Sequence, residues 1–257
     1  MNGFELHGIT HLSASQLNMW VSEPGLWIIE KLLKRSVPVG AAAHRGSAIE
    51  RGIEHGLFFA DADIKDCQTL AVQEFDRLSP LSESDPEVIA KERVIVEPAV
   101  QIGLAELRKY GPPAVPAKGR QHRIQLELDD VPIPIIGYLD FVFDEYGIVI
   151  DLKTEHKLSS CIKAPHARQV SIYRYAMHNY ETRVAYVTHR KPAVYRLEDE
   201  DAERAFNQVR CIAFRLERFL RLSRDPQELA ALVCPDPDSF YWRSPAAQRY
   251  RQEVYGY

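Results

Sequence analysis

Two acidic side chains and a lysine, Asp140, Asp151 and Lys153, lie in what we predict to be two adjoining strands. Residues 135–144 and 148–154 are both rich in β-branched and aromatic side chains, with a short turn between them. A hairpin of this kind can bring two carboxylates and an ammonium to the same end of a sheet. Carboxylate oxygens hold Mg²⁺, and such a cation acidifies a bound water and neutralises charge growing on a phosphate.

The same residues also have a purely structural interpretation. Asp140 is compatible with an ordinary strand end, and Asp151 with Lys153 forms at least a solvated salt bridge, which contributes little to stability. However, Asp151 follows three consecutive β-branched residues, so it ends a strand predicted to be buried, where an unpaired carboxylate is costly. Asp151 and Lys153 are two positions apart on a strand and therefore point to the same face. This placement favours a catalytic or metal-binding role over a purely structural one.

Three ordered motifs resemble the RecB-like branch of the PD-(D/E)XK nuclease superfamily, which reads Gly-x-x-Asp, Asp-x-Lys-Thr and Gln-x-x-x-Tyr. They are Gly137-Tyr138-Leu139-Asp140, Asp151-Leu152-Lys153-Thr154 and Gln169-Val170-Ser171-Ile172-Tyr173. The resemblance covers roughly residues 10–188. It implies an α/β fold with a restriction-endonuclease-like central mixed β-sheet flanked by helices, and a helical N-terminal region.

The resemblance also implies a role for individual side chains. Asp140 and Asp151 would be metal ligands, together with the backbone carbonyl of Leu152. Lys153 would orient the attacking water or stabilise the pentacovalent phosphorane. The residues expected to shape the site or contact the substrate are Gln169, Tyr173, Thr154, Arg45, Lys157, Lys163 and Arg168.

A third acidic ligand is expected from an upstream helix over residues 40–58. Many RecB-like enzymes carry Arg-Gly-(Ser/Thr)-x-x-His there, and that histidine binds metal. In this chain the run from Arg45 to Ile49 is followed by Glu50, which resembles phage-type enzymes such as lambda exonuclease. Glu50 is our first choice, with Glu54 second and His44 third, and the alternative is that Glu50 is a surface residue. Three carboxylates favour Mg²⁺ or Mn²⁺ over zinc.

The third motif lies on a predicted half-buried helix over residues 162–178. Pro165 is expected in its first turn, where a missing N–H costs nothing. Gln169 and Tyr173 are four positions apart, so they share one face of the helix. The structural alternative places Tyr173 in the core and Gln169 at the surface.

The formal net charge is −4, yet the charge is unevenly distributed. Between Asp151 and Arg174 there are three Lys and two Arg against one Asp and one Glu, a local balance of +3. We expect Lys153, Lys157, Lys163 and Arg168 to surround the site, and a second basic cluster consists of Lys31, Lys34 and Arg35. Such patches bind phosphate without reading sequence, although a charge run is more often a solvated face.

Other classes of protein are disfavoured by what the sequence lacks. The cysteines Cys67, Cys161, Cys211 and Cys234 are scattered, so neither structural zinc nor an iron–sulfur cluster is expected. There is no phosphate-binding loop of a motor ATPase and no apolar run of membrane-spanning length. Together these features predict a cytoplasmic protein that does not associate with membranes.

The chain is expected to fold as one domain, because 257 residues with 46% hydrophobic content can bury one substantial core. We divide it into a helical part over about 10–110, a catalytic sheet core over about 120–198, and a C-terminal helix and tail over about 199–257. Predicted helices start at Ser13 and run over 24–35, 40–58, 61–79, 86–110 (with a kink or break at Pro98) and 199–222; further strands cover 121–128, 183–188 and 193–197. Aromatic residues of the tail either seal the core or stack on unpaired bases.

These observations lead us to expect a Mg²⁺- or Mn²⁺-dependent deoxyribonuclease, most simply an exonuclease in recombination, repair or phage DNA processing. An endonuclease of the same fold and a non-catalytic DNA-binding protein are the alternatives. DNA is the expected partner, and RNA is a further candidate substrate. The resemblance also suggests a single-strand annealing protein as a partner and assembly into a homo-oligomer.

Overall fold

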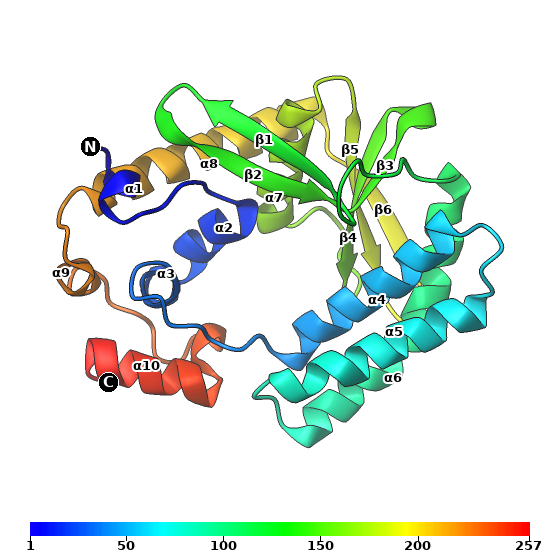
Figure 1. The fold of residues 1–257 in the computed structure, drawn as a ribbon, viewed down its shortest axis with the longest axis horizontal. Coiled ribbons are helices and arrows are strands. Elements are labelled where there is room, and N and C mark those ends of the chain that lie inside the picture. Colours follow the sequence, from blue (N-terminus) through cyan, green and yellow to red (C-terminus); the bar gives the residue numbers. More distant parts are fainter.

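A four-stranded mixed sheet lies at the centre of the computed structural model, which describes residues 1–257 (Figure 1). Its strand order is β3-β4-β5-β6, with β4 and β5 parallel and the two outer pairs antiparallel. The strands are β3 (Phe141–Phe143), β4 (Ile148–Thr154), β5 (Glu181–Val187) and β6 (Pro192–Arg196).

Helices cover both faces of this sheet, so the fold is of the α/β type (Figure 1). The α-helices are α1 (Gly3–Leu6), α2 (Ala14–Ser22), α3 (Pro24–Lys31), α4 (Ala41–Phe58), α5 (Ile64–Leu78), α6 (Pro86–Leu107), α7 (Ala164–Ala176), α8 (Asp199–Leu220), α9 (Pro226–Ala230) and α10 (Pro245–Tyr255). Short 3₁₀ turns are η1 (Ser79–Leu81), η2 (Arg108–Tyr110), η3 (Asp144–Tyr146) and η4 (Phe240–Trp242). None of the helices combines the length and apolar character needed to cross a membrane.

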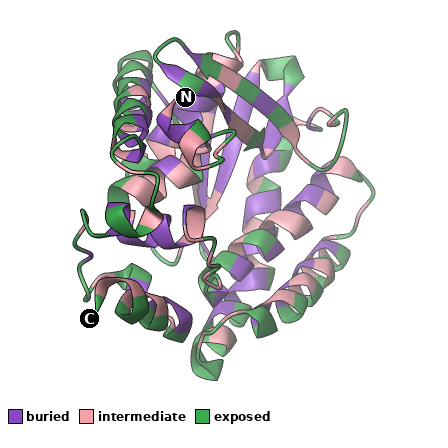
Figure 2. Cartoon of the chain, turned by 60° about the vertical axis from the view of Figure 1, so that its left-hand side comes forward, coloured by how far each residue is buried: buried purple, intermediate pink, exposed green.

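The alternation of side chains along β4 produces two apolar cores, one on each face of the sheet. Val149 belongs to the core formed with α2, α3, α7 and α8, whereas Ile148, Ile150 and Leu152 belong to the core formed with α4, α5 and α6. Figure 2 shows the buried residues concentrated between these layers. By the period of two, Asp151 is placed on the face of Val149.

The structure corrects the prediction of one continuous strand over residues 135–144. The chain breaks at Asp140: β2 (Val131–Leu139) pairs with β1 (His122–Leu128) in a separate two-stranded sheet, and β3 then joins the central sheet. The predicted hairpin is therefore formed only by β3 and β4, in which Phe141 pairs with Ile150. Asp140 lies at the corner between the two sheets rather than within a strand.

Most other predicted elements are confirmed, including α2 with its Ser13 cap, α4, α8, and α7 with Pro165 in the first turn. One boundary was wrong. Helix α3 ends at Lys31, because Lys34 adopts a left-handed conformation (φ 56°) and the N–H of Arg35 bonds back to Ile29. Of the kink or break predicted at Pro98, the break is absent: α6 continues through Pro98, and Val94, whose carbonyl the proline cannot pair with, is an exposed residue.

The C-terminal tail contributes one aromatic side chain to the interior. Trp242 is buried against Leu26, Ile29 and Ala247, whereas Phe240 remains largely exposed. The prediction that aromatic residues of the tail seal the core is therefore confirmed for Trp242, but it does not hold for Phe240.

The glycines of α4 explain how this helix packs. A Cβ at Gly52 would lie 2.6 Å from the backbone oxygen of Cys67 on α5, and one at Gly56 would lie 2.4 Å from a methyl carbon of Leu104 on α6. By contrast, a Cβ at Gly46 would meet only the Thr154 hydroxyl oxygen, at an ordinary 3.5 Å. Close helix packing therefore needs glycine at 52 and 56, but not at 46.

We predict that Gly52→Ala lowers the free energy of unfolding by about 1–3 kcal/mol, because the clash with α5 outweighs the better helix propensity of alanine. Gly46→Ala is the matched control in the same helix, and it should be neutral or stabilising by up to about 1 kcal/mol. Urea unfolding followed by circular dichroism measures both. Equal effects of the two substitutions would contradict this packing.

Candidate active site

Asp140 joins the corner between the two sheets to the central strand β4. Its Oδ2 atom accepts a hydrogen bond of 2.9 Å from the backbone N–H of Leu152. Because Leu152 lies between Asp151 and Lys153, this bond joins the second motif of the sequence to the aspartate of the first. The structure thus places Asp140 beside β4, as the sequence predicted, although by a different backbone path.

Asp151 and Lys153 lie on one face of β4, as expected from their spacing. The Asp151 side chain is 0% exposed, and its Oδ2 atom lies 2.7 Å from the Lys153 ammonium. This is an ion pair by distance, although its geometry falls outside that of a hydrogen bond. The other oxygen, Oδ1, is buried without any partner. A buried carboxylate oxygen without a donor is costly, so this atom is suited to a ligand.

Glu50 of α4 is joined to Asp140 by Gln121, a residue that the sequence did not lead us to expect in the site. The side-chain amide of Gln121, just before β1, donates to Glu50 Oε1 at 3.0 Å and to Asp140 Oδ1 at 2.9 Å. No local pattern marks Gln121, because it contacts two residues far away in the sequence. Of the three candidates on α4, Glu50 is therefore the one joined to Asp140.

The other two candidates on α4 have different surroundings. Glu54 is paired with Arg120 and with Arg51. His44 is buried, which lowers the pKa of its imidazole, and its Nε2 atom has no partner. Neither side chain forms a hydrogen bond or ion pair with Asp140 or Asp151.

The acidic group is electrostatically strained. Burial, and then the charges of Asp151 and Glu50, raise the pKa of Asp140 well above its usual range. Burial also raises the pKa of Glu50 and of Asp151, in each case against a lowering by nearby cations. For Lys153 burial acts to lower the pKa, but the surrounding carboxylates outweigh it and the pKa is raised. The pocket therefore favours additional positive charge.

The donor set fits a divalent cation in its chemistry but not yet in its arrangement. As the side chains lie, no three of them converge on a common point for a metal ion. Gln121 occupies oxygens of Glu50 and Asp140, and Lys153 is paired with Asp151. Three carboxylates with one free buried oxygen nevertheless match the oxygen ligands that Mg²⁺ and Mn²⁺ prefer. The expected role of the Leu152 carbonyl stays a prediction.

Gln169 and Tyr173 lie on one face of α7 and are joined to this group. Gln169 donates to the Tyr173 hydroxyl at 2.6 Å, and that hydroxyl donates to the carbonyl of Tyr138 at 3.0 Å. Burial, followed by the charges of Asp151 and Asp140, raises the pKa of Tyr173 well above its usual range. Both side chains line a cavity of about 420 Å³ together with Gln121 and Asp140. Tyr173 is thus buried, as the structural alternative held, and also borders the site.

Two arginines that we expected to contact the substrate are instead inside the protein. Arg45 is buried in an ion pair with Glu92 and donates to the carbonyl of Thr154 at 3.1 Å. Arg168 is buried and donates to Asn18 at 2.7 Å and to Gln208 at 3.2 Å. A guanidinium taken out of water needs such partners, which a count of charges along the sequence does not reveal. The prediction that they contact the substrate is therefore wrong, and both guanidinium groups hold neighbouring elements together.

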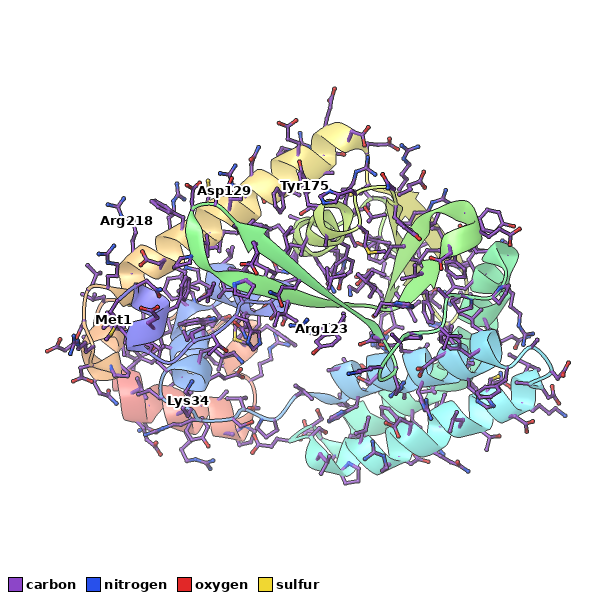
Figure 3. The ribbon with its side chains drawn as sticks, turned by 45° about the horizontal axis from the view of Figure 1, so that its top comes forward. Met1, Lys34, Arg123, Asp129, Tyr175 and Arg218 are labelled. Carbon is purple, nitrogen blue, oxygen red and sulfur yellow. The ribbon has the colours of Figure 1, made fainter.

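The remaining basic side chains differ in their exposure and in whether they form ion pairs. Lys157 is exposed, Lys163 is paired with Glu155, and Thr154 is half-buried at the end of β4. In the second basic cluster, Lys31 is paired with Glu30 and Arg35 with Glu253, whereas Lys34 is exposed (Figure 3). Neither cluster is therefore a continuous patch of free cations.

His166 is a further polar group near Lys153 that the sequence analysis did not single out. Its Nδ1 atom lies 2.8 Å from the Tyr186 hydroxyl, which also accepts the backbone N–H of Lys163 at 3.0 Å. Burial, and then the charges of Lys153 and Lys163, lower its pKa to about 4. The imidazole is therefore neutral at physiological pH and contributes no charge.

Comparison with known proteins assigns no family to this chain. No family model matches it, and no curated protein matches it. One solved structure, titled "Crystal structure of SSO0001", is 17% identical, with coverage of 75% of this chain and 96% of that chain and a TM-score of 0.36. A likeness this weak supports no argument about fold or function, so the proposal below depends on the residues themselves.

The raised pKa of Asp140 generates a test of stability against pH. A carboxyl whose folded pKa exceeds its unfolded value stabilises the fold below the unfolded pKa, and this contribution is lost as pH rises through the folded pKa. Asp140→Asn removes the charge and keeps an oxygen for the Leu152 N–H, although it gives up the hydrogen bond from Gln121. We therefore expect the variant to be more stable than the original chain at pH 8 by about 1 kcal/mol, with the advantage shrinking towards pH 4.

Thermal unfolding in the presence of a chelator measures this difference. Asp129→Asn is the control, because Asp129 is exposed at the tip of the β1–β2 hairpin (Figure 3). If Asp140→Asn shifted stability by the same amount at pH 4 and pH 8, the raised pKa of Asp140, which burial and then the neighbouring carboxylates cause, would be wrong.

Proposed function

We propose that this chain is a divalent-metal-dependent deoxyribonuclease of the PD-(D/E)XK superfamily, on the RecB-like, lambda exonuclease-like branch. We further propose that β3 to β6 with α4 and α7 form its restriction-endonuclease-like core. One observation carries the proposal: Glu50, Asp140 and Asp151 come from a helix, a sheet corner and a strand, yet contacts through Gln121 and Leu152 join them into one acidic group. Lys153 is paired with that group.

The arrangement supports phosphodiester hydrolysis because its charges suit the reaction. Glu50, Asp140 and Asp151 would hold the cation, which when bound supplies charge neutralisation at the phosphate and increases the acidity of a water molecule. Water oxygen forms a new bond to phosphorus, the bond to the leaving ester oxygen breaks, and that oxygen takes up a proton. The products are a phosphate monoester and a free hydroxyl.

Lys153 has a defined part in this reaction. Its raised pKa keeps it an ammonium, so it donates hydrogen bonds and does not accept the proton of the attacking water. Its ion pair with Asp151 holds the ammonium beside the acidic group. There it can orient the water or stabilise the charge of the pentacovalent phosphorane.

DNA contact and exonuclease action are supported by the motifs and by parts of the surface. Gln169 and Tyr173 border the cavity next to Asp140, and Lys157 is an exposed cation on the chain that follows β4. The preference for DNA ends comes from the resemblance of the Glu50 motif to phage-type exonucleases.

End-labelled duplex DNA incubated with Mg²⁺ or Mn²⁺ tests the activity. We expect Lys153→Met and Asp140→Asn to reduce the cleavage rate on the order of 10²-fold or more, because the first removes the ammonium that acts on the water or the phosphorane and the second removes a charged ligand of the cation. Asp129→Asn should cleave at the original rate, and a chelator should abolish cleavage. DNA binding without cleavage at any concentration of either metal would instead support a non-catalytic DNA-binding protein.

Linear and closed circular plasmid of the same sequence distinguish the two modes of cleavage. An exonuclease releases nucleotides from the linear form and leaves the circle intact, because it needs an end. Discrete fragments from the circular substrate would overturn the exonuclease assignment and support an endonuclease of the same fold.

A further inference from the structure

The segment between η2 and β1 is attached to α4 at two successive side chains. Arg120 donates to Glu54 (2.9 Å from Nε to Oε2), and Gln121 donates to Glu50 at 3.0 Å. Glu50 and Glu54 are one helical turn apart, so the segment follows the face of α4 that carries the acidic group. The Arg120 contact is independent of Asp140 and Asp151.

Gln121 has an unusual position, because a single neutral amide serves two carboxylates. Its NH₂ group has two hydrogens, and one is directed to Glu50 and the other to Asp140 at 2.9 Å. These bonds partly offset the repulsion between two acidic groups whose pKa values are both raised. An NH₂ group that donates in this way has no lone pair to offer to a cation.

We propose that the Gln121 amide joins Glu50 and Asp140 in the metal-free protein, and that a divalent cation displaces this amide when it binds. This inference depends on the proposed function, since it concerns the same carboxylates. The Arg120–Glu54 pair would keep the segment on α4 while the Gln121 side chain moves away. Removal of the amide therefore lowers the cost of metal binding, because two hydrogen bonds to charged groups no longer have to be broken.

Mn²⁺ binding to the metal-free protein, measured by titration calorimetry and by the electron paramagnetic resonance signal of free Mn²⁺, tests the proposal without any activity assay. We expect Gln121→Ala to bind Mn²⁺ at least about tenfold more tightly than the original chain, because both hydrogen bonds to charged groups are absent and each contributes at least about a factor of ten. Gln125→Ala is the matched control. Gln125 is an exposed residue of β1 whose amide donates to Glu127, and its loss should leave the affinity unchanged.

The outcomes separate this inference from the proposed function. Weaker binding by Gln121→Ala would show that Gln121 is a ligand, and equal binding would show that it is a bystander; either result overturns the inference while the metal site stands. Failure of the original chain to bind Mn²⁺ at millimolar concentration would overturn both.

A measurement on the unaltered chain covers the case in which the variant does not fold. The side-chain amide resonances of Gln121, observed by nuclear magnetic resonance, should shift when Mg²⁺ is added, because both hydrogen bonds are lost. The amide of Gln125 should not shift. Unchanged Gln121 resonances at saturating Mg²⁺ would overturn the inference.

Discussion

The hydrogen bond from the Leu152 backbone to Asp140 is the interaction on which the rest of the site depends. The chain leaves the two-stranded sheet at Asp140 and enters the central sheet at Phe141, so this bond is made where the two sheets meet. It sets the distance between Asp140 and the strand that carries Asp151 and Lys153. A carboxylate that accepts a backbone N–H cannot rotate freely, so the Asp140 side chain is held beside β4.

A second set of contacts fixes α4 against the end of the same strand. Arg45 is buried beside Glu92 and donates to the Thr154 carbonyl at the end of β4. Glu50 lies further along the helix and is positioned by this anchoring. The cost of burying the guanidinium is offset by its ion pair and hydrogen bonds. In this way an arginine remote from the reacting groups can determine where a carboxylate lies.

The crowded carboxylates illustrate the usual conflict between stability and function. Their raised pKa values mean that the charged forms are disfavoured in the folded protein, although Lys153, Arg120 and the Leu152 backbone N–H partly compensate. A protein selected for stability alone would not gather three acids around a strand end. Strain of this kind is expected where a cation or a substrate is to be bound, because the ligand then supplies the missing charge.

The sequence by itself determined the elements with strong periodicity, and it determined that Asp140, Asp151 and Lys153 would come together. Apolar runs and helical spacing report burial along one element, and the strand ending at Asp151 has such a run. Only the tertiary structure decided that the chain breaks at Asp140, that Arg45 and Arg168 are buried, and that Gln121 joins two acids. The physical reason is that polar groups are satisfied by partners from distant parts of the chain, and no local pattern encodes those pairings.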